Sequence, residues 1–388
     1  MKYLVLFLIL LTSCNKKSDK SDLDLEPLKK GFKETYAKIA LAAYDDALRT
    51  AKNMQSEIDQ FLKEPSAEGL EKCRKFWLAS REAYLLTEAF RFSNGPIDNK
   101  DGFEGAINAW PLDESYIDYV RGNPKSGIIN NPQDFPEISK KSILTLNEQG
   151  GETNISTGFH AIEFLLWGQD QEDTSLKTPG NRNFKDYSAP TPNADRRAAY
   201  LKAVTDLLVE HLECVQKEWE SNIPGNYREK FLASESNQSL RDILKGLFNF
   251  SKAELAGERL FVALTNKDQE DEHSCFSDNT HRDIIQDFKG IKNLVEGKFI
   301  NLKGENISGT GLLELIRNAD SEEAKELENS LKEIAGMVNE IPVPFDHAIT
   351  EEVPGQGKLS QIVNKLMALG DIFAQSIKIL KLEQREVQ

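Results

Sequence analysis

Apolar side chains recur every three or four residues along most of this chain, and this spacing constrains its fold more than any other feature. On an α-helix such spacing gathers the apolar side chains on one face, which then has to be buried against another helix. Runs that alternate apolar and polar residues, as strands do, are scarce. The sequence therefore predicts an all-α protein. The expected helices cover residues 28–62, 67–92, 154–167, 195–221, 237–264, 278–296, 311–339 and 358–382.

Two polar stretches interrupt the helical pattern, residues 93–105 (SNGPIDNKDGFEG) and residues 168–193. The second is long and carries three prolines, so it is the predicted boundary between two helical bundles, 28–194 and 195–388. The two halves share similar helix openings and similar helix ends, which favours a duplication. Chance similarity between amphipathic helices is the alternative. The matching segments are 35–61 with 199–219, and 87–101 with 257–271.

The first 14 residues, MKYLVLFLILLTSC, are typical of a bacterial lipoprotein signal. A lysine precedes an apolar run that is too short to span a bilayer, and small residues precede Cys14. We expect residues 1–13 to be removed, Cys14 to be acylated, and residues 14–27 to be a flexible tether. The predicted location is the bacterial cell envelope, anchored by lipid to the outer membrane and facing the periplasm or the cell surface.

The charge balance and the cysteines exclude several classes of protein. With 63 acidic and 48 basic side chains the formal net charge is −15, which disfavours binding to nucleic acid. Besides Cys14 the chain has three cysteines, so at most one disulfide can form within it. No CxxC motif occurs, and neither a disulfide scaffold nor a thiolate zinc site is predicted. Which pair would be joined stays open among Cys73, Cys214 and Cys275.

The segment GFHAIEFLLWGQD, residues 158–170, is apolar almost all round a helix, yet it carries His160 and Glu163 one turn apart. A buried carboxylate is costly unless it is paired or bound to a cation. Two interpretations meet that demand. The two side chains hydrogen-bond to each other within the fold, or both ligate a metal ion.

Further acidic residues and histidines gather where polar loops meet apolar helices. Oxygen and nitrogen ligands of this kind suit iron or zinc. The alternative for each acidic run taken singly is a solvated loop. The additional candidates for a shared cleft are Glu88, Arg91, Asp98, Asp101, Asp113, His273, Asp278 and His281.

Several catalytic motifs are absent from the sequence. There is no HExxH, and the inverted HxxEH zinc-protease motif lacks its second histidine because Phe164 follows Glu163. A GxSxG elbow, a GxxxxGK[ST] phosphate loop and a GxGxxG turn between a strand and a helix are also absent. These absences leave metal binding as the chemistry that the residues favour.

Four segments in order resemble the imelysin family, and in particular its iron-regulated lipoprotein branch. They are GFHAIEFLLWGQD, which carries the GxHxxE motif, RFSNGPID, INAWPLDE and DQEDEHSCFSDNTHRDI. The resemblance covers nearly all of the chain after residue 28. It implies two helical bundles related by duplication, with a site in the cleft between them. Gly158, His160 and Glu163 take the positions of the motif.

The resemblance leaves three functions open. The first is an iron-binding lipoprotein of an iron-uptake system, with His160 and Glu163 as ligands, zinc as the alternative metal, and transport components as partners. In it Gly158 allows a close approach, and Arg91 orients a carboxylate or holds an anion. The second is a metal-dependent peptidase, which needs a glutamate that activates water. The third is a receptor for an organic ligand such as a siderophore, with an aromatic pocket. The aromatic candidates are Phe90, Phe92, Trp110 and Trp167.

Overall fold

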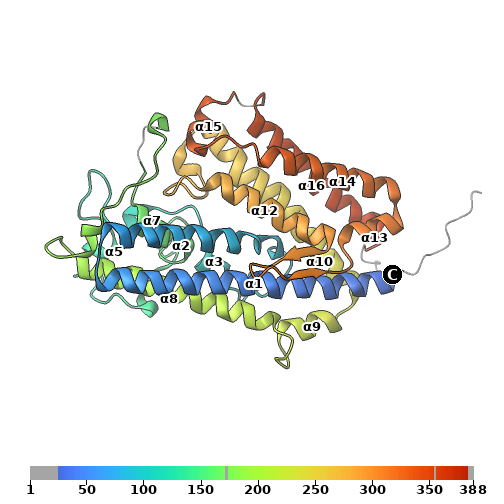
Figure 1. The fold of residues 1–388 in the computed structure, drawn as a ribbon, viewed down its shortest axis with the longest axis horizontal. Coiled ribbons are helices and arrows are strands. Elements are labelled where there is room, and N and C mark those ends of the chain that lie inside the picture. The colour runs from blue at the N-terminus through green and yellow to red at the C-terminus, as the bar shows by residue number, and fades with distance from the viewer. Residues whose placement is uncertain (1–24, 171–173, 354, 383–388) are drawn as a thin grey trace, which may run out of the picture.

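The computed structural model describes residues 25–170, 174–353 and 355–382, and their fold is helical apart from one short hairpin (Figure 1). The prediction of an all-α protein is confirmed. The signal peptide, Cys14 and the tether as far as residue 24 lie outside the described residues. Within the described ranges, no helix combines the length and the apolar character needed to cross a membrane.

The long helices match the expected ones closely, and short elements fill the loops between them. The long helices are α1 (Glu26–Lys63), α2 (Ala67–Leu85), α8 (Ala194–Trp219), α10 (Ser236–Asn249), α12 (Thr280–Glu296), α14 (Ser321–Val338) and α16 (Lys358–Ile379). The shorter α-helices are α3 (Glu104–Ile107), α4 (Glu114–Ile117), α5 (Gly127–Asn130), α6 (Lys140–Leu146), α7 (Gly158–Trp167), α9 (Tyr227–Ala233), α11 (Ala263–Asn266), α13 (Leu312–Ala319) and α15 (Phe345–Glu351). The remaining elements are the turns η1 (Glu88–Phe90), η2 (Thr174–Leu176), η3 (Phe184–Tyr187) and η5 (Gln269–Asp271), the π-helix η4 (Phe250–Val262), and the antiparallel strands β1 (Lys298–Ile300) and β2 (Asn306–Ser308).

The helix expected over residues 311–339 is divided into α13 and α14. The division falls at Asp320, which has an extended backbone and whose carboxylate accepts hydrogen bonds from the backbone amides of Glu322 and Glu323. An aspartate in this position caps a new helix, because it satisfies amide groups that have no partner within the helix. The apolar spacing alone could not show this break.

Two groups of helices form the molecule. In the first bundle α1 runs along α2 and α8, and α7 packs against α2 and α8. In the second bundle α16 packs against α10, η4 and α14, and α12 packs against α14. The two bundles meet where α12 contacts α2 and η1 (Figure 1). Helix α8, which follows the predicted boundary at residue 194, packs against α1 and α7.

The π-helix η4 continues α10 without a break and changes which side chains share a face. Its hydrogen bonds join residues five apart, so Glu254 and Arg259 come together. The Arg259 guanidinium donates to Oε1 of Glu254 at 2.8 Å. In an α-helix, residues at this spacing point in different directions. The π winding therefore aims both side chains at the junction between the bundles.

The three cysteines of the described region are unpaired. Cys73 and Cys275 are buried, whereas Cys214 is exposed on α8. Burial raises the pKa of the Cys73 thiol to about 12, which keeps it protonated and unreactive. The disulfide that the sequence left open is therefore not part of this structure.

Helix α7 is the centre of the first bundle, since all of its residues are buried. It begins at Gly158, whose backbone φ of +84° is rarely adopted by residues that have a Cβ. A Cβ at this position would lie 2.5 Å from the carbonyl oxygen of Ile107. Glycine is required here because α7 starts against the end of α3.

We expect Gly158→Ala to destabilise the protein by about 2–3 kcal/mol, because alanine meets both an unfavourable φ and a backbone clash. Urea denaturation followed by circular dichroism measures the loss. The matched control is Gly336→Ala in α14, where a Cβ meets no atom within 4 Å. That change should leave stability unchanged or raise it slightly. Equal midpoints for the two variants would contradict the prediction.

Candidate functional site

His160 and Glu163 lie side by side on α7, as the sequence predicts. The Nδ1 atom of His160 is 3.2 Å from Oε2 of Glu163. Both side chains are buried, with exposed fractions of 1% and 0%. Their surroundings on α7 are apolar, so the pair forms a polar island inside the first bundle.

A loop more than 100 residues further along the chain, residues 272–279, completes this polar island. Ser277 donates to Oε1 of Glu163 through its backbone amide at 3.0 Å and through its hydroxyl at 2.6 Å. The ring of His273 lies beside that of His160, with centroids 4.9 Å apart. Trp110 stands edge-on to His273 on the other side. Two of the predicted histidines are thus brought together over more than a hundred residues of sequence.

Arg81 of α2 is the positively charged side chain of this site. One of its terminal nitrogen atoms lies 3.4 Å from Nε2 of His160 and 3.1 Å from Nδ1 of His273. The same nitrogen donates to Oδ2 of Asp283 at 3.0 Å, and that oxygen also lies 2.8 Å from His273 Nδ1. The guanidinium also bonds to Asn108. Arg81 therefore links α2, α7 and α12 from a position with no exposure to solvent.

Burial decides the charge of the histidines and of Glu163. It raises the pKa of Glu163 to about 8, so that this carboxyl holds a proton at neutral pH when no cation is bound. Burial, followed by the charges of Arg81 and the other histidine, keeps the pKa of His160 well below its usual range. The pKa of His273 is lowered in the same way by burial and by Arg259. Both imidazoles are neutral, which is the form that ligates metals.

A second buried network adjoins the site around Glu88 of η1. Oε2 of Glu88 accepts from Arg259 at 2.5 Å and from Arg91 at 3.2 Å. Arg259 also donates to Asp287 of α12 at 2.7 Å, and Arg91 pairs with Glu104 at 3.2 Å. Burial opposes the ionised form of Glu88, but Arg91 and Arg259 more than offset it and lower the pKa to about 2. Arg91 is thereby engaged by carboxylates of the chain itself.

The other predicted residues lie away from His160. Asp98 accepts from the backbone amide of Phe92, the Asp101 side chain is exposed, and Asp113 caps α4. These three shape a loop. The Nδ1 atom of His281 donates to the carbonyl oxygen of Asp278 at 3.1 Å, at the start of α12. Asp278 belongs to a separate cluster of carboxylates.

Sequence reasoning missed Arg81 and Arg259. A signal for Arg81 was present, because it follows Cys73 and Trp77 at helical spacing and so lies on the buried face of α2. A charged residue on such a face requires a buried partner. Its partner Asp283 is about 200 residues distant, so the pairing itself leaves no local signal in the sequence.

The four aromatic residues considered for an organic ligand lie in different surroundings. Trp167 lines a hollow of about 620 Å³ whose wall also contains Ser277. Phe90 packs in the core against Tyr36 and Trp219. Trp110 stands against His273, and Phe92 lies under the Arg91 guanidinium. The hollow at Trp167 comes within one side chain of Glu163, since Ser277 touches both.

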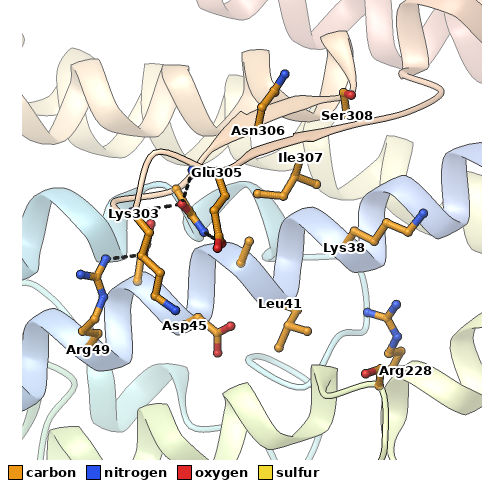
Figure 2. Close-up of a pocket in the computed structure, with 14 residues that line it drawn as sticks. Lys38, Leu41, Asp45, Arg49, Arg228, Lys303, Glu305, Asn306, Ile307 and Ser308 are labelled. Atoms are coloured by element: carbon orange, nitrogen blue, oxygen red, sulfur yellow. Dashed lines mark hydrogen bonds and ion pairs between the residues drawn. The ribbon is translucent and has the colours of Figure 1, made fainter.

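A larger hollow of about 680 Å³ lies between α1 and the hairpin β1–β2, shown in Figure 2. Lys38, Asp45 and Arg49 of α1 face Lys303 and Glu305 of the hairpin across it. Charges of both signs are mixed in its wall. None of the predicted site residues lines this hollow.

Comparisons with known proteins give one consistent family. The family model described as Imelysin, Peptidase_M75, matches residues 40–372. Iron-regulated protein A of Synechococcus elongatus is 22% identical over 316 residues, which cover 79% of this chain and 74% of the relative.

Two solved structures share the fold. One is described as an iron-regulated protein A precursor from Parabacteroides distasonis, with 18% identity, a TM-score of 0.70, and coverage of 92% of this chain and 95% of that one. The other is described as an imelysin-like protein from Psychrobacter arcticum, with 15% identity, a TM-score of 0.60, and coverage of 93% and 97%. The arrangement of helices described above is therefore similar to that of known structures.

We expect Arg259→Met to destabilise the protein by about 3–5 kcal/mol, because Glu88 and Asp287 stay buried with less positive charge to compensate them. The matched control on the same helix is Lys252→Met, which removes a partly exposed ion pair with Asp371. Such a pair contributes less than about 1 kcal/mol. Urea denaturation of the two variants makes the comparison, and similar losses would refute the compensating role of Arg259.

His211 of α8 generates a prediction about acid stability. Its ring stacks on Phe103 at 4.8 Å, and burial lowers its pKa. His211 therefore binds a proton more readily in the unfolded chain than in the folded protein. The free energy of unfolding falls as the pH drops below the usual histidine pKa of about 6.5.

In His211→Phe this proton is absent from both states, while the ring can still stack on Phe103. Between about pH 6.5 and 5 the variant should lose less stability than the parent, by at most about 1.4 kcal/mol per pH unit. Urea midpoints measured across this range test the difference. Parallel pH curves for the two proteins would show that His211 is protonated equally in both states.

Proposed function

This chain belongs to the imelysin family, and on this premise we propose that it binds an iron ion through His160 and Glu163 as part of iron uptake. The ion lies at the junction of the two bundles, between α7 and the loop 272–279. The relatives described as iron-regulated protein A support iron as the metal. Zinc is the alternative, because imidazole and carboxylate ligands serve both.

The distance between the two donor atoms is the observation that carries this proposal. Nδ1 of His160 and Oε2 of Glu163 are 3.2 Å apart. Two atoms that each lie about 2.1 Å from one ion are separated by this distance when the angle at the ion is about 100°. An ion held between them takes the place of the hydrogen bond that joins them in the structure.

The charge of the site favours a cation beside Glu163. The described residues include no lysine or arginine ion-paired with this buried carboxyl, whose other oxygen is held by Ser277. A bound cation supplies the missing charge. Arg81 lies beside Nε2 of His160, on the other edge of the ring, so the ion binds on the edge that faces Glu163.

Binding accounts for the residues better than peptide hydrolysis does. A hydrolase needs a glutamate that takes a proton from the attacking water, and such a base works best with a pKa near the working pH. Glu88 is one glutamate near the site and outside α7, and its ion pairs with Arg91 and Arg259 hold its pKa at about 2. This carboxylate is a poor base.

The proposed place of action is the bacterial envelope, with Cys14 acylated and the folded part tethered to the outer membrane by the residues that follow. A lipid anchor keeps an iron-binding protein close to the membrane across which the metal moves. Transport components that receive the ion are the proposed partners.

Calorimetric titration with Fe²⁺, Fe³⁺ and Zn²⁺ tests the proposal on the parent protein, His160→Ala and Glu163→Gln. We expect one iron ion per chain in the parent and an affinity at least 100-fold weaker in both variants, since each loses one ligand. Thermal unfolding of each variant shows whether it is folded.

The matched control is His281→Ala, which removes a histidine that bonds to a backbone carbonyl at the start of α12. It should bind iron as the parent does. Equal affinity in the parent and in both α7 variants would show that His160 and Glu163 only hydrogen-bond within the fold. Tighter binding of zinc than of either iron ion would overturn the choice of metal, and metal-dependent cleavage of a peptide would reassign the function.

A further inference from the structure

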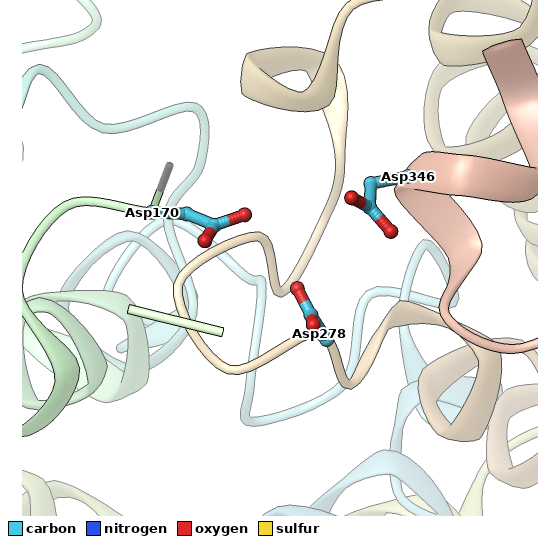
Figure 3. Close-up of side chains that lie close together, drawn as sticks. All are labelled: Asp170, Asp278 and Asp346. Atoms are coloured by element: carbon cyan, nitrogen blue, oxygen red, sulfur yellow. The ribbon is translucent and has the colours of Figure 1, made fainter. Parts of the chain in front are cut away.

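Three carboxylates from three separate segments meet beyond the end of α7. Asp170 follows α7, Asp278 precedes α12, and Asp346 lies in the first turn of α15. One oxygen atom of each lies within 4.8 Å of the others. Figure 3 shows the three side chains directed toward one shared space. The first bundle supplies one of them, and the C-terminal half of the chain supplies two.

Buried oxygen atoms in this cluster lack hydrogen-bond donors. Asp346 is 97% buried, at 3% exposure, and its Oδ1 accepts no hydrogen bond. Oδ1 of Asp278 is buried and equally unpartnered. Polar atoms in this state are rare in folded proteins, and each one indicates a partner that is missing from the chain. Since the carboxylate of Asp346 is aimed at the other two in Figure 3, the missing partner lies between them.

A fourth acidic side chain interacts with the three aspartates. Glu272 is 1% exposed, and neither of its oxygen atoms accepts a hydrogen bond. Burial raises its pKa well above the usual range, and the charges of Asp346, Asp278 and Asp170 raise it further. Burial likewise raises the pKa of Asp278 to about 7, followed by the charges of Asp170 and Asp346. Each carboxylate opposes ionisation of its neighbours.

Asp278, Asp346 and Glu272 differ from the carboxylates around Glu88 in their ion pairs. Among the ion pairs of the described residues, none joins a lysine or arginine to Asp278, Asp346 or Glu272. Burial raises the pKa of Asp346, and the charges of His347 and Lys177 oppose that rise. In the ion network around Glu88, by contrast, arginines bond directly to the carboxylates. The two clusters are therefore built for different partners.

We propose that Asp170, Asp278 and Asp346 bind a hard divalent cation, Ca²⁺, that joins the first bundle to the second. An all-oxygen set of anionic ligands selects hard cations, whereas a site with imidazole favours iron or zinc. Ca²⁺ lies about 2.3–2.6 Å from its ligands, so ligands on opposite sides of it are about 4.6–5.2 Å apart. No two of the three oxygen atoms are more than 4.8 Å apart, so one ion can contact all three. Water and Glu272 complete the shell or balance its charge.

The cation would also fix the loop 272–279. Asp278 is next to Ser277, which bonds to Glu163, and the same loop carries His273 beside His160. An ion that ties this loop to α7 and α15 holds those side chains in place. The site has its own ligands and goes beyond the proposed iron site, so either can exist without the other.

The test uses the full chain, purified in detergent, stripped with a chelator and then titrated with Ca²⁺, Mg²⁺ and Mn²⁺ by calorimetry and thermal unfolding. The variants are Asp278→Asn and Asp346→Asn. Asparagine keeps the shape of the side chain and tolerates the positive φ of 54° at position 278. We expect one Ca²⁺ per parent chain and a rise in Tm of a few degrees. Affinity should fall at least tenfold in each variant.

The stripped proteins give a second readout that loss of folding cannot imitate. Without metal, both variants should unfold at a higher temperature than the parent, because each removes one charge from a repelling cluster. The matched control is Glu351→Gln, an exposed acidic residue of the same helix α15, which should behave as the parent. Equal Ca²⁺ responses in all proteins, no response in the parent, or tighter binding of Mg²⁺ would each overturn the proposal.

His160→Ala separates this inference from the proposed function. It should lose iron and keep the Ca²⁺ response, while Asp346→Asn should do the opposite. Loss of the Ca²⁺ response in His160→Ala would show that the carboxylate cluster is no site of its own.

Discussion

Compensation of buried charge at the junction of the bundles is the constraint on which the remaining structure depends. Arg81 and Arg259 have almost no exposure, and each bonds to an aspartate of α12. A buried ion without its partner costs several kcal/mol, so these elements can be packed only in the arrangement that brings the partners together. The apolar faces of the helices restrict the arrangement of the two bundles less than these ion pairs do. The ionic contacts therefore specify how the second bundle sits on the first.

This compensation of buried charge does not extend to Glu163 on α7. Arg81 faces both histidines, and Ser277 of the loop 272–279 donates to one oxygen of Glu163, but no lysine or arginine of the described residues is ion-paired with that carboxyl. Arginines bond directly to Glu88, whereas the ion pairs of the described residues join no lysine or arginine to Glu163, Asp278 or Asp346. Imidazole lies beside Glu163, whereas the aspartate cluster offers only oxygen atoms. The two metal ions that we propose, iron and Ca²⁺, differ because of this difference in ligands.

Much of the fold was predictable because helical spacing is a local property. The long helices begin and end near their expected residues, and the break at Asp320 depends on a cap rather than on apolar spacing. The pairing of His160 with Glu163 was predictable for the same reason, since residues three apart on a helix are neighbours. Arg81 was within reach of the same reasoning, because it lies on the buried face of α2. The membership of the imelysin family, inferred from four short segments, is confirmed.

The sequence by itself determined that the chain is helical, that α7 is buried all round, and that a histidine and a glutamate share one of its faces. Only the tertiary structure decided what those two side chains meet. The site also contains residues more than 100 positions away along the chain, namely Ser277, His273 and Asp283. Asp346 likewise lies near Asp170, which is more than 100 positions away from it. Contacts over such distances depend on how whole helices pack and on where buried charges find their partners. Such contacts produce no periodic pattern in the sequence, because each one depends on a single residue from each of two distant segments.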